Sequence, residues 1–349
     1  MRLFFGVALF VFFSCAGEAQ IVANASATPH AGAANRLMQD RRYAEAAAEF
    51  QEAVALDPAN DTLRVQYATC LFAEESNQEA KRQFEILRQR LGDRPGLIYF
   101  LGQIELRTND FKGAVEILHP LATNAAFPKV SYYLGLAYLG LGDDAEGLHF
   151  LERAAAQNPQ DSEVHYRLAR LYSKAGREHD AEGEYARYNE LLDEQRIAEQ
   201  KGHDCMDALR SKALDSARNV CQPLAQSTNP RELTFVGRLY LQASAFADAL
   251  PPLQQAVKLD PKSFDASYYL GATLYGLRRY PDAVQPLETA VSLNPLYFDS
   301  INLLAKTYHL LGNDSATLRL LERAHSLNPD DAVVTEVLER MRAASSAKH

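Results

Sequence analysis

The residues best suited to chemistry stand together in one short segment, His203-Asp204-Cys205, which combines an imidazole, a carboxylate and a thiol. Such a trio acts as a metal ligand set or as part of a catalytic triad only where the side chains converge. Consecutive residues of a helix point in different directions, and no further ligand follows at helical spacing. The segment therefore predicts neither a metal site nor a catalytic centre.

Sequence motifs typical of enzymes are absent from the rest of the chain. It contains no H-E-x-x-H motif, no G-x-S-x-G motif, no C-x-x-C pair and no phosphate-binding P-loop. Residues 140–145 (GLGDDA) resemble a dinucleotide-binding loop, but no strand precedes them. We therefore predict that the protein is not an enzyme and that it holds no cofactor and no metal.

The charge balance bears on the class of partner. The chain of 349 residues carries 36 Lys and Arg against 45 Asp and Glu, which gives a formal net charge of −9. A broad nucleic-acid or anionic-membrane footprint requires a basic face. We therefore predict no nucleic-acid partner, although a local basic groove is compatible with this balance.

The first residues have the composition of an export signal. Arg2 precedes an apolar run at 3–13, and small residues lead up to Ala19. This run is too short to cross a bilayer as a helix, which needs about 20 residues. We predict a signal peptide at 1–19, a short linker at 20–26 and a location in the periplasm or cell envelope. Two alternatives stay open, an uncut membrane anchor and lipidation of Cys15, and only these would tie the protein to a membrane.

Beyond these single residues, a regular period runs through most of the chain. Pro261, Pro295 and Pro329 are evenly spaced, and Pro159 lies three periods before the first of them. Each of these prolines follows Asn or Asp, and the same order of small and large apolar residues comes before it. Small residues allow two antiparallel helices to approach closely, whereas proline cannot continue a helix. The period therefore predicts a series of helical hairpins.

This pattern resembles the tetratricopeptide repeat (TPR) family, and the resemblance covers about nine-tenths of the chain. With positions numbered 1 to 34, small residues fall at 8 and usually at 20 and 27, large apolar ones at 7 and 24, and proline at 32. The resemblance implies an all-α fold, a right-handed α-solenoid of about nine helix-turn-helix repeats. The predicted hairpins span 27–60, 61–94, 95–127, 128–161, 162–195, 230–263, 264–297 and 298–331.

Residues 196–229 have the length of one repeat but not its pattern. Sliding the template by two residues puts Cys205 at position 8 and Cys221 at position 24, which lie on facing helices in the family. We predict a degenerate hairpin joined by a disulfide, as an oxidising compartment permits. The alternatives are two buried thiols in place of the disulfide, and an interruption that splits the array into two blocks. An enzyme with its active site in this irregular segment is the least favoured function.

The final segment, 332–349, is predicted to be a capping helix followed by a tail. Val333, Val334, Val337, Leu338 and Met341 form an apolar stripe, and charged residues occupy the other side. An open repeat array needs an end helix with such a polar outer face.

In the family that these repeats resemble, positions 2, 5, 9, 12 and 13 of each first helix line a concave binding face. Here those positions hold seven basic residues against three acidic ones (Glu163, Asp265 and Asp299), which reverses the balance of the whole chain. The predicted groove residues are Tyr99, Arg107, Tyr132, Tyr166, Arg170, Lys174, Arg238, Tyr268, Tyr275 and Lys306.

Such a groove suits an extended peptide with acidic side chains or a C-terminal carboxylate. The resemblance therefore implies a non-catalytic scaffold or adaptor that binds a protein or peptide partner. Exported bacterial members of the family often serve outer-membrane assembly, secretion or polysaccharide export. The alternative is an accessory or regulatory subunit of an envelope enzyme or of an export assembly.

Overall fold

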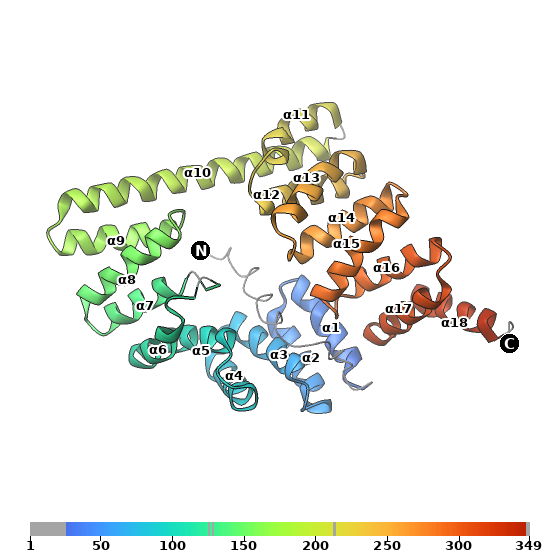
Figure 1. Ribbon diagram of the computed structural model, residues 1–349, viewed down its shortest axis with the longest axis horizontal. Coiled ribbons are helices and arrows are strands. Elements are labelled where there is room, and N and C mark those ends of the chain that lie inside the picture. Colours follow the sequence, from blue (N-terminus) through green and yellow to red (C-terminus); the bar gives the residue numbers. More distant parts are fainter. Residues whose placement is uncertain (1–25, 125, 128, 212–213, 347–349) are drawn as a thin grey trace. The chain divides into compact units, whose positions relative to one another are not determined.

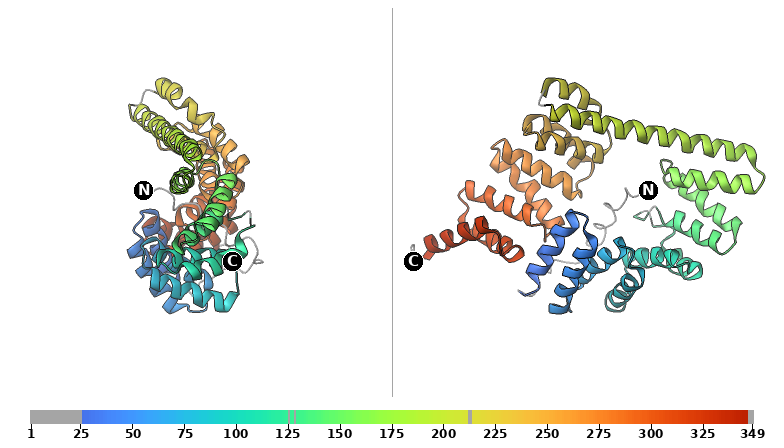
Figure 2. Two further views of the ribbon diagram at one scale, coloured as in Figure 1. Left: turned by 90° about the vertical axis from the view of Figure 1, so that its left-hand side faces the viewer. Right: turned by 180° about the vertical axis from the view of Figure 1, so that it is seen from behind.

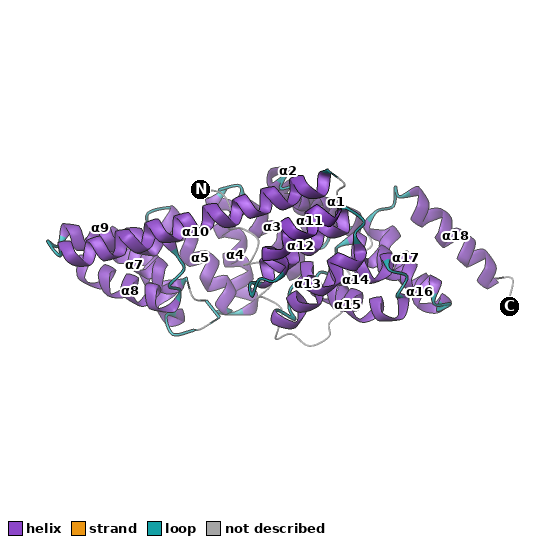
Figure 3. Cartoon of the chain, turned by 90° about the horizontal axis from the view of Figure 1, so that it is seen from above, coloured by secondary structure: helices purple, strands orange, loops and turns teal. Residues whose placement is uncertain are grey.

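The computed structural model describes residues 26–346, except 125, 128 and 212–213. Over these residues the chain forms helices and short turns without a strand (Figure 3). No helix in this part of the chain combines the length and apolar character needed to cross a membrane. The predicted signal peptide and Cys15 lie outside the described residues. The elements are α1 (Thr28–Gln39), α2 (Tyr43–Leu56), α3 (Asp61–Ala73), α4 (Asn77–Leu91), α5 (Pro95–Arg107), α6 (Phe111–Leu118), the 3₁₀ turn η2 (His119–Leu121), α7 (Val130–Gly140), α8 (Asp144–Gln157), α9 (Ser162–Lys174), α10 (Glu178–Arg210), α11 (Leu214–Ala225), α12 (Pro230–Gln242), α13 (Phe246–Leu259), α14 (Phe264–Gly276), α15 (Tyr280–Leu293), α16 (Phe298–Leu310), α17 (Asp314–Leu327) and α18 (Ala332–Ser346).

The helices gather into two compact units. Unit 1 is formed by Arg41–Arg196, and unit 2 by the chain from Ile197 onward together with α1. The division falls inside α10, a single helix of 33 residues that stands out by its length in Figure 2. The hairpin boundary predicted between residues 195 and 196 therefore lies within a continuous helix.

Within each unit, helices that follow one another pack in pairs, and the second helix of one pair packs on the first helix of the next (Figure 1). This arrangement confirms the predicted all-α solenoid of helical hairpins. The pairs are α3 with α4, α5 with α6 and α7 with α8 in unit 1, and α12 with α13, α14 with α15 and α16 with α17 in unit 2.

Close packing inside a pair depends on glycine at position 8 facing leucine at position 24. A Cβ atom added to Gly271 would lie 2.5 Å from Cγ of Leu287, and one added to Gly237 would lie 2.4 Å from Cγ of Leu253. Both leucines are fully buried. The glycines therefore set the distance between the paired helices, as the period of the sequence predicts.

The turn between the two helices of a repeat contains one residue in the left-handed region, at position 15. At this position φ is +80° for Gly142 and +59° for Arg278. The amide of Asp143 donates to the carbonyl of Tyr138 at 2.9 Å, which closes a Schellman motif. Residues 140–145 are thus a helix end. The residues with this conformation are Arg41, Glu75, Asn109, Gly142, Gly176, Ser244, Arg278 and Gly312.

A disulfide joins α11 to the C-terminal part of α10. The sulfur atoms of Cys205 and Cys221 are 2.04 Å apart, the Cα atoms are 4.8 Å apart, and both residues are buried. α11 also packs on α12, the first helix of the regular pairs in unit 2. The irregular segment 196–229 therefore adds a helix to unit 2 and fixes it to α10 covalently.

α1 completes unit 2 from the opposite end of the sequence, because it packs against α17. A Cβ atom added to Gly32 would lie 1.9 Å from the carbonyl oxygen of Leu327. The same oxygen accepts a hydrogen bond of 3.1 Å from Nη1 of Arg36. The backbones of α1 and α17 are therefore in direct contact at Gly32. Arg36 donates to a carbonyl in the last turn of α17 that has no hydrogen-bond partner within the helix.

α18 packs on α17 as well and covers it through Val334 and Leu338, which are buried. Val333 is 61% exposed, so the predicted apolar stripe is wrong at this residue. Successive residues of a helix are about 100° apart, and the turn that buries Val334 directs Val333 toward solvent.

Candidate peptide-binding surface

The first helices of successive pairs in unit 2 form one continuous surface. α12 contacts α14, and α14 contacts α16, while the second helices pack behind them. We call the side of α12, α14 and α16 that carries repeat positions 2, 5 and 9 the first-helix face. Its charged residues are Arg231, Arg238, Asp265, Asp299 and Lys306.

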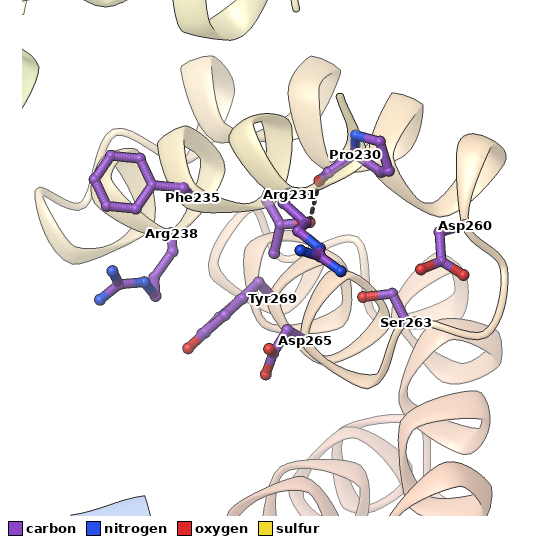
Figure 4. Close-up of a pocket in the computed structure, with 9 residues that line it drawn as sticks. Pro230, Arg231, Phe235, Arg238, Asp260, Ser263, Asp265 and Tyr269 are labelled. Atoms are coloured by element: carbon purple, nitrogen blue, oxygen red, sulfur yellow. Dashed lines mark hydrogen bonds between the residues drawn. The ribbon is translucent and has the colours of Figure 1, made fainter. Parts of the chain in front are cut away.

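A pocket lies on this face between α12 and α14. Arg231 and Arg238 contribute from α12, and Asp265 and Tyr269 contribute from α14. Figure 4 shows the side chains of Arg238, Asp265 and Tyr269 extending to the same open side. The remaining lining residues are Pro230, Thr234, Phe235, Asp260 and Ser263.

The basic side of the pocket comes from α12. The guanidinium carbon of Arg238 lies 5.5 Å from the ring centroid of Phe235, which is within cation–π range. Thr234 donates its hydroxyl to the carbonyl of Pro230 at 2.7 Å and so closes the first turn of the helix. Among the described residues, neither Arg231 nor Arg238 forms an ion pair within 4.0 Å. Both guanidinium groups can therefore bind an external carboxylate.

The acidic side of the face is built into a cluster of aromatic rings. The ring centroid of Tyr297 lies 4.8 Å from that of Phe264 and 5.3 Å from that of Tyr268. Tyr268 in turn contacts Tyr269 at 5.3 Å. We call the set of Phe264, Tyr268, Tyr269, Tyr297, Asp265 and Asp299 the tyrosine–carboxylate cluster.

Desolvation dominates the electrostatics of this cluster. Burial raises the pKa of the Asp265 carboxyl, and the nearby charge of Arg238 opposes that rise. Burial also raises the pKa of Asp299, against Lys306 and a hydrogen bond from Tyr297. Water reaches both carboxylates, yet the surrounding protein removes part of their hydration. A cation placed here would restore the stabilisation that the lost hydration provided.

The tyrosine hydroxyls of the cluster remain protonated. Burial raises the pKa of Tyr268, and the negative charge of Asp299 raises it further. Burial likewise raises the pKa of Tyr297, and the charges of Tyr268 and Asp299 raise it further. These hydroxyls are therefore hydrogen-bond donors at every physiological pH.

Two predicted groove residues of unit 1 bind neighbouring repeats. Nη1 of Arg107 donates to the carbonyl of Phe72 at 2.8 Å, and its guanidinium lies 3.8 Å from the Phe72 ring centroid. Lys174 forms an ion pair with Asp144. Both cations link one repeat to the preceding one, which reduces the charge that they offer to a partner.

The predicted tyrosines of unit 1 are packed against neighbours. The ring of Tyr99 lies 5.1 Å from that of Phe127, and the hydroxyl of Tyr132 accepts from Nε of Arg167 at 3.1 Å. Further along, the ring of Tyr166 lies 5.2 Å from that of Tyr188, and the exposed Arg170 lies 5.9 Å from the Tyr166 ring.

In unit 2, Arg238, Tyr268 and Lys306 share the first-helix face, whereas Tyr275 does not contribute to the pocket. Tyr275 lies near the end of α14, where its ring contacts Tyr280 at 5.4 Å. The prediction missed Tyr269 and Tyr297. Tyr297 is the last residue of its repeat, and its closeness to position 5 of the same repeat is visible only after folding.

The described part of the chain can also be compared with the requirements of a metal site, a reactive thiol and a catalytic histidine. No group of three His, Cys, Asp or Glu residues there is arranged to hold a metal ion. Burial raises the pKa of the Cys70 thiol to about 12, which keeps it protonated and unreactive. Both ring nitrogens of His165 have hydrogen-bond partners: Nδ1 lies 2.6 Å from Oε2 of Glu184, and Nε2 lies 3.1 Å from the carbonyl oxygen of Pro159.

Several solved helical-repeat structures are similar to the chain at low sequence identity. MamA 41-end from Desulfovibrio magneticus RS-1 is 19% identical, with a TM-score of 0.44, over 50% of this chain and 98% of that one. The Cut9 and Hcn1 hetero-tetramer of APC/C matches at 14% identity and a TM-score of 0.37, over 85% and 59%. YrrB, described as a TPR protein with an unusual peptide-binding site, matches at 15% and 0.31, over 66% and 97%.

No curated protein matches the chain in sequence. Two family models, both described as tetratricopeptide repeat, do match it. One covers residues 99–161 and 237–316, and the other covers 37–95 and 138–198, so that together they span more than half of the chain. With the position 8 glycines, the left-handed turns and the paired helices described above, the chain belongs to the tetratricopeptide repeat family.

Proposed function

We propose that this protein is a non-catalytic scaffold of the bacterial cell envelope, which binds an extended peptide segment of a partner protein on the first-helix face. Repeats of this family present such surfaces to protein partners. One observation carries the proposal: Arg231 and Arg238 on α12 face the pocket that Asp265 and Tyr269 complete from α14. Tyrosine and arginine are the residues that most often dominate binding energy in interfaces.

The envelope location rests on two features. The segment 1–19 has the order of charge, apolar run and small residues that export signals share. The disulfide between Cys205 and Cys221 suits an oxidising compartment. Cell fractionation with an antibody tests the location, and recovery of the protein in the cytoplasm with the segment 1–19 intact would contradict it.

Partner binding is tested by capture from a native envelope extract on the immobilised mature protein. The test variant is Arg231→Glu/Arg238→Glu, which reverses the charge of the basic side of the pocket. The matched control is Lys258→Glu, a reversal at an exposed residue of α13, a second helix. We expect wild type and control to retain a stoichiometric partner and the double variant to lose it, with equal Tm for all three. Retention by the double variant would refute the assignment of the face.

A further inference from the structure

The charge on the first-helix face changes sign between α12 and α14, whereas α16 carries one charge of each sign, Asp299 and Lys306. Repeat position 2 holds Arg231 on α12, Asp265 on α14 and Asp299 on α16. Arg238, at position 9 of α12, adds a second cation about two helical turns further along, and both line the same pocket as Asp265. A partner that contacts both α12 and α14 therefore meets guanidinium groups on the first helix and the carboxylate of Asp265 on the second.

The two halves of the surface differ in the ligand that they favour. Each of the two guanidinium groups on α12 can offer paired N–H donors to a carboxylate, and that of Arg238 lies over the Phe235 ring. In the tyrosine–carboxylate cluster, the carboxylates of Asp265 and Asp299 can accept hydrogen bonds from a cation, and the rings of Tyr268 and Tyr297 pack together beside them. Partly desolvated carboxylates beside aromatic rings favour a guanidinium or an ammonium group.

We infer that unit 2 recognises a peptide segment that carries one acidic and one basic side chain, the acid bound by Arg231 and Arg238 and the base bound by the tyrosine–carboxylate cluster. The inference rests on the proposed function. It narrows the partner class, because in a uniformly acidic peptide the second carboxylate would meet Asp265 and be repelled.

The spacing of the two charges follows from helix packing. Axes of neighbouring packed helices lie about 8–10 Å apart. An extended peptide advances about 3.3 Å per residue. The acidic and basic residues of the partner should therefore stand about three positions apart along its sequence.

Selection of a phage-displayed library of random dodecapeptides against the full mature protein tests this inference. We expect enrichment of peptides with an acidic and a basic residue about three positions apart. Synthetic versions of these peptides should bind Arg231→Glu/Arg238→Glu at least about tenfold more weakly, whereas Lys258→Glu should bind them like wild type.

Charge reversal separates a two-part surface from general electrostatic attraction. Selection against Arg231→Glu/Arg238→Glu should replace only the acidic position of the enriched peptides by a basic one. Selection against Asp265→Lys/Asp299→Lys should replace only the basic position by an acidic one. Asp265→Asn/Asp299→Asn serves where the lysine variant fails to fold, and it should abolish the preference for a base at that position.

Two other outcomes would overturn the inference, and they differ in what they leave standing. Enriched peptides of a single charge sign that still lose binding in Arg231→Glu/Arg238→Glu would refute the two-part surface and leave the proposed function intact. Peptides that bind both charge-reversed variants as tightly as wild type, or no enrichment at all, would refute the first-helix face as the binding site as well.

Discussion

Replacing Gly271 with alanine should destabilise unit 2, although alanine is the better helix former. The new Cβ atom would lie 2.5 Å from Cγ and 2.6 Å from Cδ2 of Leu287, well inside van der Waals contact. Overpacking of this kind costs about 1–3 kcal/mol, and the exchange of glycine for alanine within a helix returns about 0.8–1 kcal/mol. We therefore expect a net loss of up to about 2 kcal/mol in the free energy of unfolding.

The same contact predicts the sign of a coupling energy. Leu287→Ala alone should cost about 2–5 kcal/mol, because Leu287 is fully buried. In the Gly271→Ala background the shortened side chain removes the clash. The double variant should therefore be more stable than the sum of the single changes by about 1–3 kcal/mol. Urea unfolding followed by far-UV circular dichroism measures this energy, since the chain contains no tryptophan to report by fluorescence.

Gly183 of α10 is the control, since an added Cβ atom there meets no other atom within 4 Å. Gly183→Ala should stabilise the protein by about 0.5–1 kcal/mol through helix propensity alone. Equal gains from Gly183→Ala and Gly271→Ala, or additivity of Gly271→Ala and Leu287→Ala, would refute the repeat register.

Three further predictions concern the turns, the disulfide and the acidic cluster. Gly312 and Ser244 both have positive φ, a conformation that glycine adopts more easily than other residues. Gly312→Ala should therefore lower the free energy of unfolding by about 1 kcal/mol, and Ser244→Gly should raise it by about 1 kcal/mol. Urea titration measures both changes, and shifts of the two variants in the same direction would contradict the prediction. Cys221→Ser removes the disulfide and should lower the free energy of unfolding by about 3 kcal/mol, because the unfolded chain is no longer closed into a loop. The variant should have a lower Tm that reductant does not change further. In the control Cys70→Ala, reductant should lower Tm as it does in wild type. Desolvation raises the pKa of Asp299, so the folded state disfavours its ionised form. Asp299→Asn should therefore raise Tm at pH 7. This gain should fade as the pH falls through the raised pKa of the folded state toward the ordinary carboxyl value of 3.8, and it should be absent below that value, where the acid is protonated in both states. A gain that is constant from pH 7 to below 3.8 would argue for a purely steric effect.

The architecture could be predicted because it depends on contacts that recur within one repeat. Gly271 and Leu287 meet across a single hairpin, so one period of sequence contains both partners. The conformation at position 15 could not be predicted from residue type, since Arg278 adopts a positive φ there just as Gly142 does. There the Schellman hydrogen bonds of the turn determine the backbone, and the side chain has little part in it.

The candidate site was harder to predict because its side chains are shared between repeats. Position 13 of two repeats supplied Arg107 and Lys174 to the predicted groove, yet each binds a residue of the preceding repeat. Repeat positions describe each helix face separately, so they do not show that a side chain binds a residue of the preceding repeat. For the same reason the count of basic residues hid the change of sign between Arg231 and Asp265, which is the informative feature of unit 2.

The contact between α1 and α17 has a consequence for biosynthesis. Arg36 and the carbonyl that it binds in Leu327 are 291 positions apart in the chain. At a translation rate of about 5–20 residues per second, α1 emerges roughly 15–60 s before its partner exists. During that interval the side of α1 that contacts α17, which includes Gly32, has no α17 to pack against. A polypeptide released before Leu327 is added would lack this contact altogether, so α1 would not be held in unit 2 in such a truncated product.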